Sequence, residues 1–83
     1  MNALVSIITP SYNSAKFIAE TIQSVQNQTY QNWEMIIVDD GSSDETENVV
    51  LSIIQNDNRI QFHKLSQNSG PAVARNSGIE KAS

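Results

Sequence analysis

One short segment, WEMIIV at residues 33–38, runs directly into two aspartates, and it constrains the fold more than any other stretch. Five of its six side chains are apolar, so an extended chain here places apolar groups on both faces. Strands of this kind occur mainly in parallel sheets that helices cover on each side. The segment therefore predicts a buried strand of a parallel α/β sheet, with Asp39 and Asp40 at its carboxyl end.

The segments around this strand alternate between strand and helix patterns. They predict a strand at residues 4–9, a helix at 15–28, the strand at 33–38, a helix from about residue 44, a strand at 60–65 nearer an edge, and a helix at 71–81. Helices that connect successive strands make those strands parallel and the crossovers right-handed. The sequence thus predicts a single α/β domain over residues 1–83, with the order β-α-β-α-β-α and a three-stranded parallel sheet.

Local signals predict where these elements begin and end. Proline has no N–H to donate, so we expect the hydrogen-bond ladder of the first strand to stop at Pro10. Asn13 or Ser14 can cap the first helix through a side-chain oxygen. Capping-box spacing occurs twice before the second helix, in Ser42 with Glu45 and in Asp44 with Glu47.

Composition excludes several classes of protein. The net charge is −4, and the five basic residues are scattered, so no basic stripe for nucleic acid is present. The chain has no cysteine, which excludes disulfides and thiolate ligands and fits a reducing compartment. No apolar run approaches the roughly 20 residues of a membrane span. The first ten residues lack the basic and long apolar regions of a signal peptide, so none is predicted.

Three polar loops follow the three predicted strands. Their sequences are PSYNS, DDGSSDE and SQNSG. Parallel strands bring such loops to one edge of the sheet, and open α/β sheets bind ligands at that edge. We therefore expect the functional site there.

The residue types in these loops leave several roles open. Asp39 and Asp40 can brace the loop by accepting N–H groups, or they can accept hydrogen bonds from a ligand. A divalent cation would need further ligands, and the nearby Asp44 is better placed as a helix cap. Tyr12 can stack on a planar ring or cover the first helix. The only histidine, His63, is expected on the opposite face of the third strand from Phe62, as an ordinary edge residue.

Known phosphate-binding patterns are absent from the sequence. It contains neither G-x-G-x-x-G nor G-x-x-x-x-G-K-[ST], and its three glycines are too sparse for a phosphate cradle. Acidic loops can still bind a nucleotide by accepting hydrogen bonds from base N–H and ribose O–H groups.

Three motifs together resemble the N-terminal part of the family 2 glycosyltransferases, which are inverting enzymes of the GT-A fold. The motifs are V-S-I-I-T-P-S-Y-N, the strand ending in V-D-D-G-S-S-D-x-T, and G-P-A-V-A-R-N-x-G near the end of the chain. The resemblance covers essentially all 83 residues. It implies a Rossmann-like, three-layer α/β unit that binds a nucleotide-diphosphate sugar, often UDP-linked.

The resemblance also implies roles for individual residues. The residues implied in nucleotide binding are Pro10, Ser11, Tyr12, Asp39, Asp40 and Arg75, with Thr9 a weaker candidate. Asp40 would accept the base N3–H, Asp39 would support the loop or reach the ribose, and Arg75 would lie near base or diphosphate. Charge-assisted hydrogen bonds of this kind are about twice as strong as neutral ones.

The other parts of such an enzyme have no counterpart in the sequence. The Asp-x-Asp metal motif, the catalytic base and the acceptor-binding half are all lacking, so no catalytic or metal-binding residue is predicted. We expect a donor-binding segment that is inactive alone, from an enzyme that uses Mg²⁺ or Mn²⁺ and a saccharide or lipid-linked acceptor. The resemblance implies a cytoplasmic reaction, in some members at the cytosolic face of a membrane. We also expect homo-oligomers through the exposed first strand.

Two other interpretations stay open from the sequence. A small, non-catalytic α/β module could bind a nucleotide or only a protein partner. A nucleotidylyltransferase is disfavoured, because such enzymes usually carry a glycine-rich, basic loop after the first strand.

Overall fold

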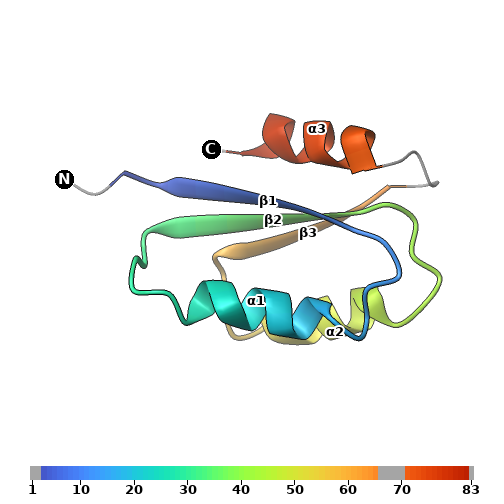
Figure 1. The fold of residues 1–83 in the computed structure, drawn as a ribbon, viewed down its shortest axis with the longest axis horizontal. Coiled ribbons are helices and arrows are strands. Elements are labelled where there is room, and N and C mark those ends of the chain that lie inside the picture. The colour runs from blue at the N-terminus through green and yellow to red at the C-terminus, as the bar shows by residue number, and fades with distance from the viewer. Residues whose placement is uncertain (1–2, 66–70, 83) are drawn as a thin grey trace.

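The sheet is built from three parallel strands in the order β1-β2-β3, with helices on both faces (Figure 1). The elements are β1 (Val5–Ser11), α1 (Ile18–Gln26), β2 (Trp33–Asp39), α2 (Thr46–Ile54), β3 (Ile60–Lys64) and α3 (Pro71–Lys81). The computed structural model describes residues 3–65 and 71–82, without the side chains of Pro71, Ala72, Ala74, Arg75 and Ser77. The predicted element order and the parallel sheet are confirmed.

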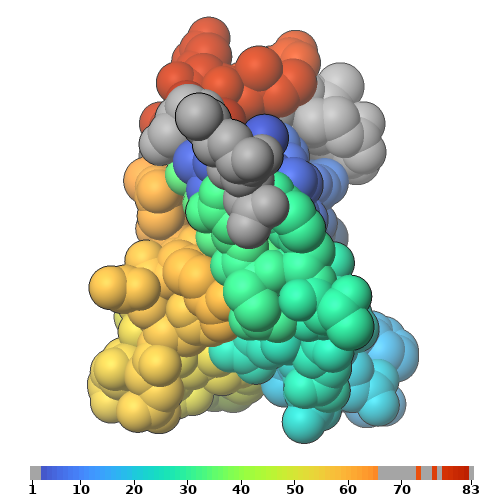
Figure 2. Space-filling view, turned by 90° about the vertical axis from the view of Figure 1, so that its left-hand side faces the viewer, coloured from blue at the N-terminus to red at the C-terminus, as the bar shows by residue number. Residues whose placement is uncertain are grey.

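The molecule has three layers, with α3 on one face of the sheet and α1 and α2 on the other (Figure 1). Figure 2 views it from the end at which the strands begin. There β1 and β3 lie at the two sides of the sheet, below α3 and above the other two helices. No described helix is both long enough and apolar enough to cross a bilayer.

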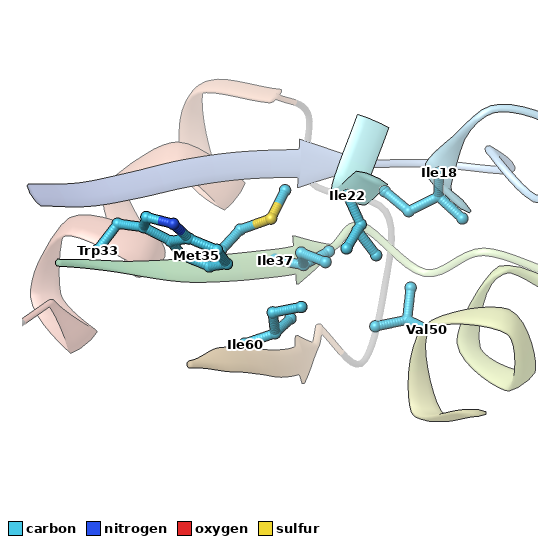
Figure 3. Packing of buried hydrophobic residues seen from close by; sticks show 7 residues of the cluster. All are labelled: Ile18, Ile22, Trp33, Met35, Ile37, Val50 and Ile60. Carbon is cyan, nitrogen blue, oxygen red and sulfur yellow. The ribbon is translucent and has the colours of Figure 1, made fainter. Parts of the chain in front are cut away.

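The main hydrophobic core lies between the sheet and helices α1 and α2 (Figure 3). Its buried members are Ile18, Ile22, Trp33, Met35, Ile37, Val50 and Ile60. On the other face of β2, Ile36 and Val38 pack with Ile8, Leu65 and Ala82. Every residue of β2 is buried, which confirms the prediction from its unbroken apolar run. Each such aliphatic side chain contributes about 1.5–3 kcal/mol through burial.

Helix α3 approaches β1 and β2 closely at Gly78. A Cβ atom at this position would lie 2.4 Å from Cγ2 of Ile8 and 3.3 Å from Cγ2 of Val38. Glycine therefore removes the atom that would otherwise hold the helix away from the sheet.

The strand β1 runs through Pro10, so the prediction that its ladder stops there is wrong. Val5 donates its N–H to the carbonyl of Asn32 (3.0 Å), and the carbonyl of Ser11 accepts the N–H of Asp40 (2.8 Å). Alternate residues of a strand direct their polar backbone groups to opposite sides, so Pro10 faces the outer edge of β1. The missing N–H thus removes no bond to β2.

Helices α1 and α2 both begin later than predicted. Helix α1 starts at Ile18, not near residue 15, and no side chain caps it; the carbonyl of Ser14 accepts the N–H groups of Phe17 and Ile18. Helix α2 starts at Thr46, and its N-cap residue Glu45 makes no side-chain cap bond. The predicted side-chain cap of α1 and the Ser42–Glu45 capping box are therefore wrong. Of the Asp44–Glu47 box the first half is present, since Oδ1 of Asp44 accepts the N–H of Thr46 at 3.0 Å.

Candidate functional site

The loops after β1 and β2 start side by side because the register pairs Ser11 with Asp39. The ladder continues one step further, since Asp40 donates its N–H to the carbonyl of Ser11 at 2.8 Å. On the other side, the carbonyl of Asp39 accepts the N–H of Leu65 at 2.8 Å. The end of β2 is therefore held from both neighbouring strands.

A shallow pocket of about 130 Å³ lies at this edge of the sheet. Pro10, Ser11, Tyr12 and Asp40 line it. The side chain of Tyr12 is half exposed, whereas Asp40 is buried. These are four of the six residues implied by the family resemblance, and they come together from two segments separated by 28 residues.

The carboxylate of Asp39 is not part of the pocket lining and braces the loop. It is fully buried, and its Oδ1 accepts the hydroxyl of Ser11 at 2.9 Å and the hydroxyl of Ser42 at 2.5 Å. Its Oδ2 accepts the N–H of Ser42 at 2.7 Å. Three donors thus compensate the burial of these polar oxygens. Of the two roles that the sequence left open for Asp39, the structure shows the loop brace.

A second set of hydrogen bonds joins the two loops directly. The N–H of Asn13 donates to Oγ of Ser42 at 2.8 Å, and Oδ1 of Asn13 accepts the N–H of Ser43 at 2.9 Å. The N–H of Ser14 donates to Oγ1 of Thr46 at 2.8 Å. Sequence reasoning missed these contacts, and a pattern of hydroxyl and amide side chains in both loops was the only signal for them.

The side chain of Asp44 takes part in the same junction. Its Oδ1 accepts the N–H of Thr46 at 3.0 Å, and its Oδ2 accepts the N–H of Ala15 at 3.2 Å. The hydroxyl of Thr46 lowers the pKa of Asp44 most, and these two N–H groups add to that effect. Asp44 therefore stays ionised and bound within the protein, at the start of α2.

These carboxylates do not fit a divalent metal. Asp39 and Asp44 are already coordinated by protein donors, and only Asp40 lines the pocket. Within residues 3–65 and 71–82, no three His, Cys, Asp or Glu side chains are grouped as metal ligands would be.

The remaining predicted residues lie elsewhere or outside the described set. The side chain of Arg75 and the loop at residues 66–70 are not among the described parts of the structure. His63 lies in β3, where its ring is within hydrogen-bond distance of Gln61 (3.1 Å). Burial lowers the pKa of His63, and the nearby Lys81 lowers it further.

Comparison with known proteins identifies the family. Residues 6–83 match the family described as Glycosyl transferase family 2. Over 79 residues the chain is 49% identical to TuaG of Bacillus subtilis, a putative teichuronic acid biosynthesis glycosyltransferase; the match covers 95% of this chain and 31% of that protein.

Solved structures agree with this assignment. TarS of S. aureus in complex with UDP-GlcNAc superposes with a TM-score of 0.89 at 33% identity, over 98% of this chain and 24% of that one. A mannosyltransferase of Pyrobaculum calidifontis in complex with GDP-Man and Mn²⁺ gives a TM-score of 0.88 at 26% identity, over 95% and 24%. The chain thus spans about a quarter to a third of the length of these proteins. On these matches, the chain belongs to glycosyl transferase family 2 and has the architecture of the N-terminal part of the GT-A fold.

Proposed function

We propose that the pocket at the ends of β1 and β2 binds the base and ribose of a nucleotide-diphosphate sugar, probed most directly as UDP. The observation that carries this proposal is the lining itself, a half-exposed aromatic ring of Tyr12 beside the carboxylate of Asp40. An aromatic face stacks on a planar base, and a carboxylate accepts a base N–H. The TarS complex with UDP-GlcNAc supports a nucleotide-sugar donor in this family.

The size of the pocket supports binding of only part of the donor. Pockets for small molecules usually measure about 300–1,000 Å³, and this one measures about 130 Å³. Such a volume suits one planar base better than a complete nucleotide sugar. We propose that residues 1–83 form one donor-binding domain segment, with Asp39 holding the loop and Arg75 near the base or diphosphate.

In the proposed reaction, a catalytic base deprotonates an acceptor hydroxyl of a saccharide or a lipid-linked saccharide. The hydroxyl then attacks the anomeric carbon with inversion, and the nucleoside diphosphate leaves. A divalent metal, Mg²⁺ or Mn²⁺, would stabilise the leaving diphosphate, and the Mn²⁺ in the mannosyltransferase complex supports its use in the family. The loops described above supply donor recognition and neither of these catalytic groups. By family resemblance we place the reaction on the cytoplasmic side.

Titration of UDP into the chain, followed by amide NMR, tests the proposal. We expect shifts at Ser11–Asn13 and Asp39–Ser42, and binding about tenfold weaker in Asp40→Asn, because a charge-assisted hydrogen bond from the base becomes a weaker neutral one. Glu20→Gln, the same chemical change at an exposed position of α1, should bind as the wild type does. Incubation with UDP-GlcNAc and a saccharide acceptor should release no UDP from this chain alone.

A set of nucleotides tests the role of Asp40 more sharply. UDP and GDP both carry a ring N–H that a carboxylate can accept, whereas N3 of CDP is an acceptor. We expect CDP to bind weakly to the wild type, and the preference for UDP over CDP to fall in Asp40→Asn, whose amide can also donate. Wild-type protein that is folded but shows no shift with any of these nucleotides at millimolar concentration would refute the proposed function and favour a protein-binding module.

A further inference from the structure

Tyr12, the exposed aromatic residue of the pocket, lies between two residues that are bound to the neighbouring loop. On one side, the hydroxyl of Ser11 donates to Oδ1 of Asp39 at 2.9 Å. On the other side, the N–H of Asn13 donates to Oγ of Ser42 at 2.8 Å. The backbone at Tyr12 is therefore fixed from both directions, although its ring is half exposed.

Ser42 connects these two anchors. Its hydroxyl accepts the N–H of Asn13 and donates to Oδ1 of Asp39 at 2.5 Å, while its own N–H donates to Oδ2 of Asp39 at 2.7 Å. Ser42 is only 7% exposed, so water does not readily replace these bonds. One buried hydroxyl thus links the anchors on both sides of Tyr12.

Asn13 adds a conformational constraint at the same point. It has a φ of 47°, the left-handed region, which asparagine tolerates better than most residues other than glycine. Its Oδ1 accepts the N–H of Ser43 at 2.9 Å, which holds the turned backbone against the second loop. The path of the backbone directly after Tyr12 therefore depends on Asn13 as well as on Ser42.

We infer that Ser42 and Asn13, anchored on Asp39, are positioning residues that hold Tyr12 in its binding orientation before any ligand arrives. The inference rests on the proposed nucleotide site and deepens it, since it assigns residues outside the lining of the pocket. A side chain whose backbone is already fixed loses less conformational entropy when its ring stacks on a base. Removing either anchor should then weaken nucleotide binding through Tyr12 alone.

The first test compares Ser42→Ala with two matched variants. We expect Ser42→Ala to weaken UDP binding about tenfold, because the N–H of Asn13 and one oxygen of Asp39 lose a partner. Ser42→Thr keeps the hydroxyl and should restore the affinity to within about threefold of the wild type. Ser52→Ala removes an exposed hydroxyl that donates to the carbonyl of Val49 in α2, and it should leave the affinity unchanged.

A double-mutant cycle then asks whether Ser42 acts through Tyr12. Tyr12→Ala should itself weaken UDP binding about tenfold by loss of stacking. In that background, Ser42→Ala should cost less than about twofold, because the ring that it positions is gone. Additive losses in the double variant, or unchanged UDP affinity in Ser42→Ala, would overturn the inference and leave the proposed function intact.

Two further measurements keep the test decisive. If Ser42→Ala does not fold, Asn13→Gly replaces it, since glycine can adopt the positive φ, removes the acceptor for Ser43 and gives the backbone after Tyr12 more freedom. We expect its UDP affinity to fall about threefold, and an unchanged affinity would overturn the inference.

If the wild type does not bind UDP, the proposed function fails. The positioning of Tyr12 is then tested in the free protein, by comparing the backbone order of wild type and variant. The amide order parameter of Tyr12 should then fall from about 0.85 toward 0.6 in the variant, and an equal value in both proteins would overturn it.

Discussion

At the residue scale, Asp39 and Asp40 have the same side chain and different surroundings. Successive side chains leave a strand in opposite directions, so only one of two neighbours can turn toward the loop behind the pocket. Asp39 is bound there by Ser11 and Ser42, while Asp40 lines the pocket. Substitution of Asp39 should therefore change the conformation of the loop that forms the site. Substitution of Asp40 should instead remove a carboxylate hydrogen-bond acceptor from the pocket.

A second carboxylate is held tightly at the opposite end of the sheet. Arg59 donates Nε to Oδ1 and Nη2 to Oδ2 of Asp57, each at 2.9 Å, and its guanidinium lies 3.9 Å from the centre of the Trp33 ring. The hydrogen bonds from Arg59 are the main cause that lowers the pKa of Asp57 well below its usual range, and Gln26 adds to the effect. The Asp57–Arg59 pair therefore packs against Trp33, a buried member of the main core and the first residue of β2.

Stability should therefore depend on pH through Asp57. The pKa of Asp57 is lower in the folded chain than in the unfolded chain, so its contribution is complete above about pH 5 and decreases as pH falls through about 4. We expect Asp57→Asn to melt a few degrees below the wild type at pH 6, and this difference to shrink toward pH 2. Thermal melts of both proteins across this range measure it. A difference that stays constant with pH would contradict this linkage; Asp44 is present in both proteins and cancels.

At the scale of elements, the packing of α3 against the sheet depends on the absence of a side chain at Gly78. The Cβ of any other residue at position 78 would overlap Cγ2 of Ile8, a branched methyl that cannot turn away without moving the side chain. The helix would have to lift from β1 and β2, and contacts of Ile8 and Val38 under it would loosen. The packing of this layer therefore requires glycine despite its poor helix propensity.

Gly78→Ala should be destabilising even though alanine is the better helix former. We expect a net loss of about 1–2 kcal/mol, because overpacking costs about 1–3 kcal/mol and helix propensity returns up to about 1 kcal/mol. Urea denaturation measures the change. Asn76→Ala, at an exposed position of the same helix, should be neutral or stabilising, and the same result for Gly78→Ala would show that α3 is not packed closely there.

At the scale of the whole molecule, the outer edge of β1 is available for pairing. Among the described residues no strand pairs with this edge, and the sheet order places β1 at one side. Alternate residues such as Ser6 and Ile8 direct their backbone groups outward, since Val5 bonds inward to Asn32. Leu4 and Val5 are half exposed beside them. Unpaired edges with apolar side chains invite pairing with another chain.

We therefore propose that this chain self-associates through β1. Sedimentation velocity over a range of concentrations should show dimers that increase with concentration. Val5→Lys places a charge at the exposed start of the strand, and it should shift the population toward monomer by unfavourable pairing of like charges. A wild-type protein that sediments as a monomer at high concentration would exclude this mode of association.

The sequence by itself determined the architecture and the edge of the sheet at which the polar loops meet. Apolar residues on both faces of β2, and helical periodicity on either side of it, are local patterns that burial imposes on each segment. Right-handed crossovers then leave a single edge where the polar loops meet. For this reason the two loops that line the pocket could be predicted from these patterns, whereas the choice of Pro10, Ser11, Tyr12 and Asp40 within them came from the family resemblance.

Only the tertiary structure decided how the polar groups in the loops are paired. Ser42 and Asp44 have capping-box spacing, and Oδ1 of Asp44 does accept the local N–H of Thr46. The hydroxyl of Ser42 and Oδ2 of Asp44 instead accept N–H groups from Asn13 and Ala15, about 30 residues away. The ladder passes Pro10 because the register turns that residue outward. Local spacing shows which donors and acceptors are near each other in sequence. It does not show which donors from a distant loop will compete for the same acceptor in the folded chain. Hydrogen bonds across the two loops are therefore what tertiary structure added to this site.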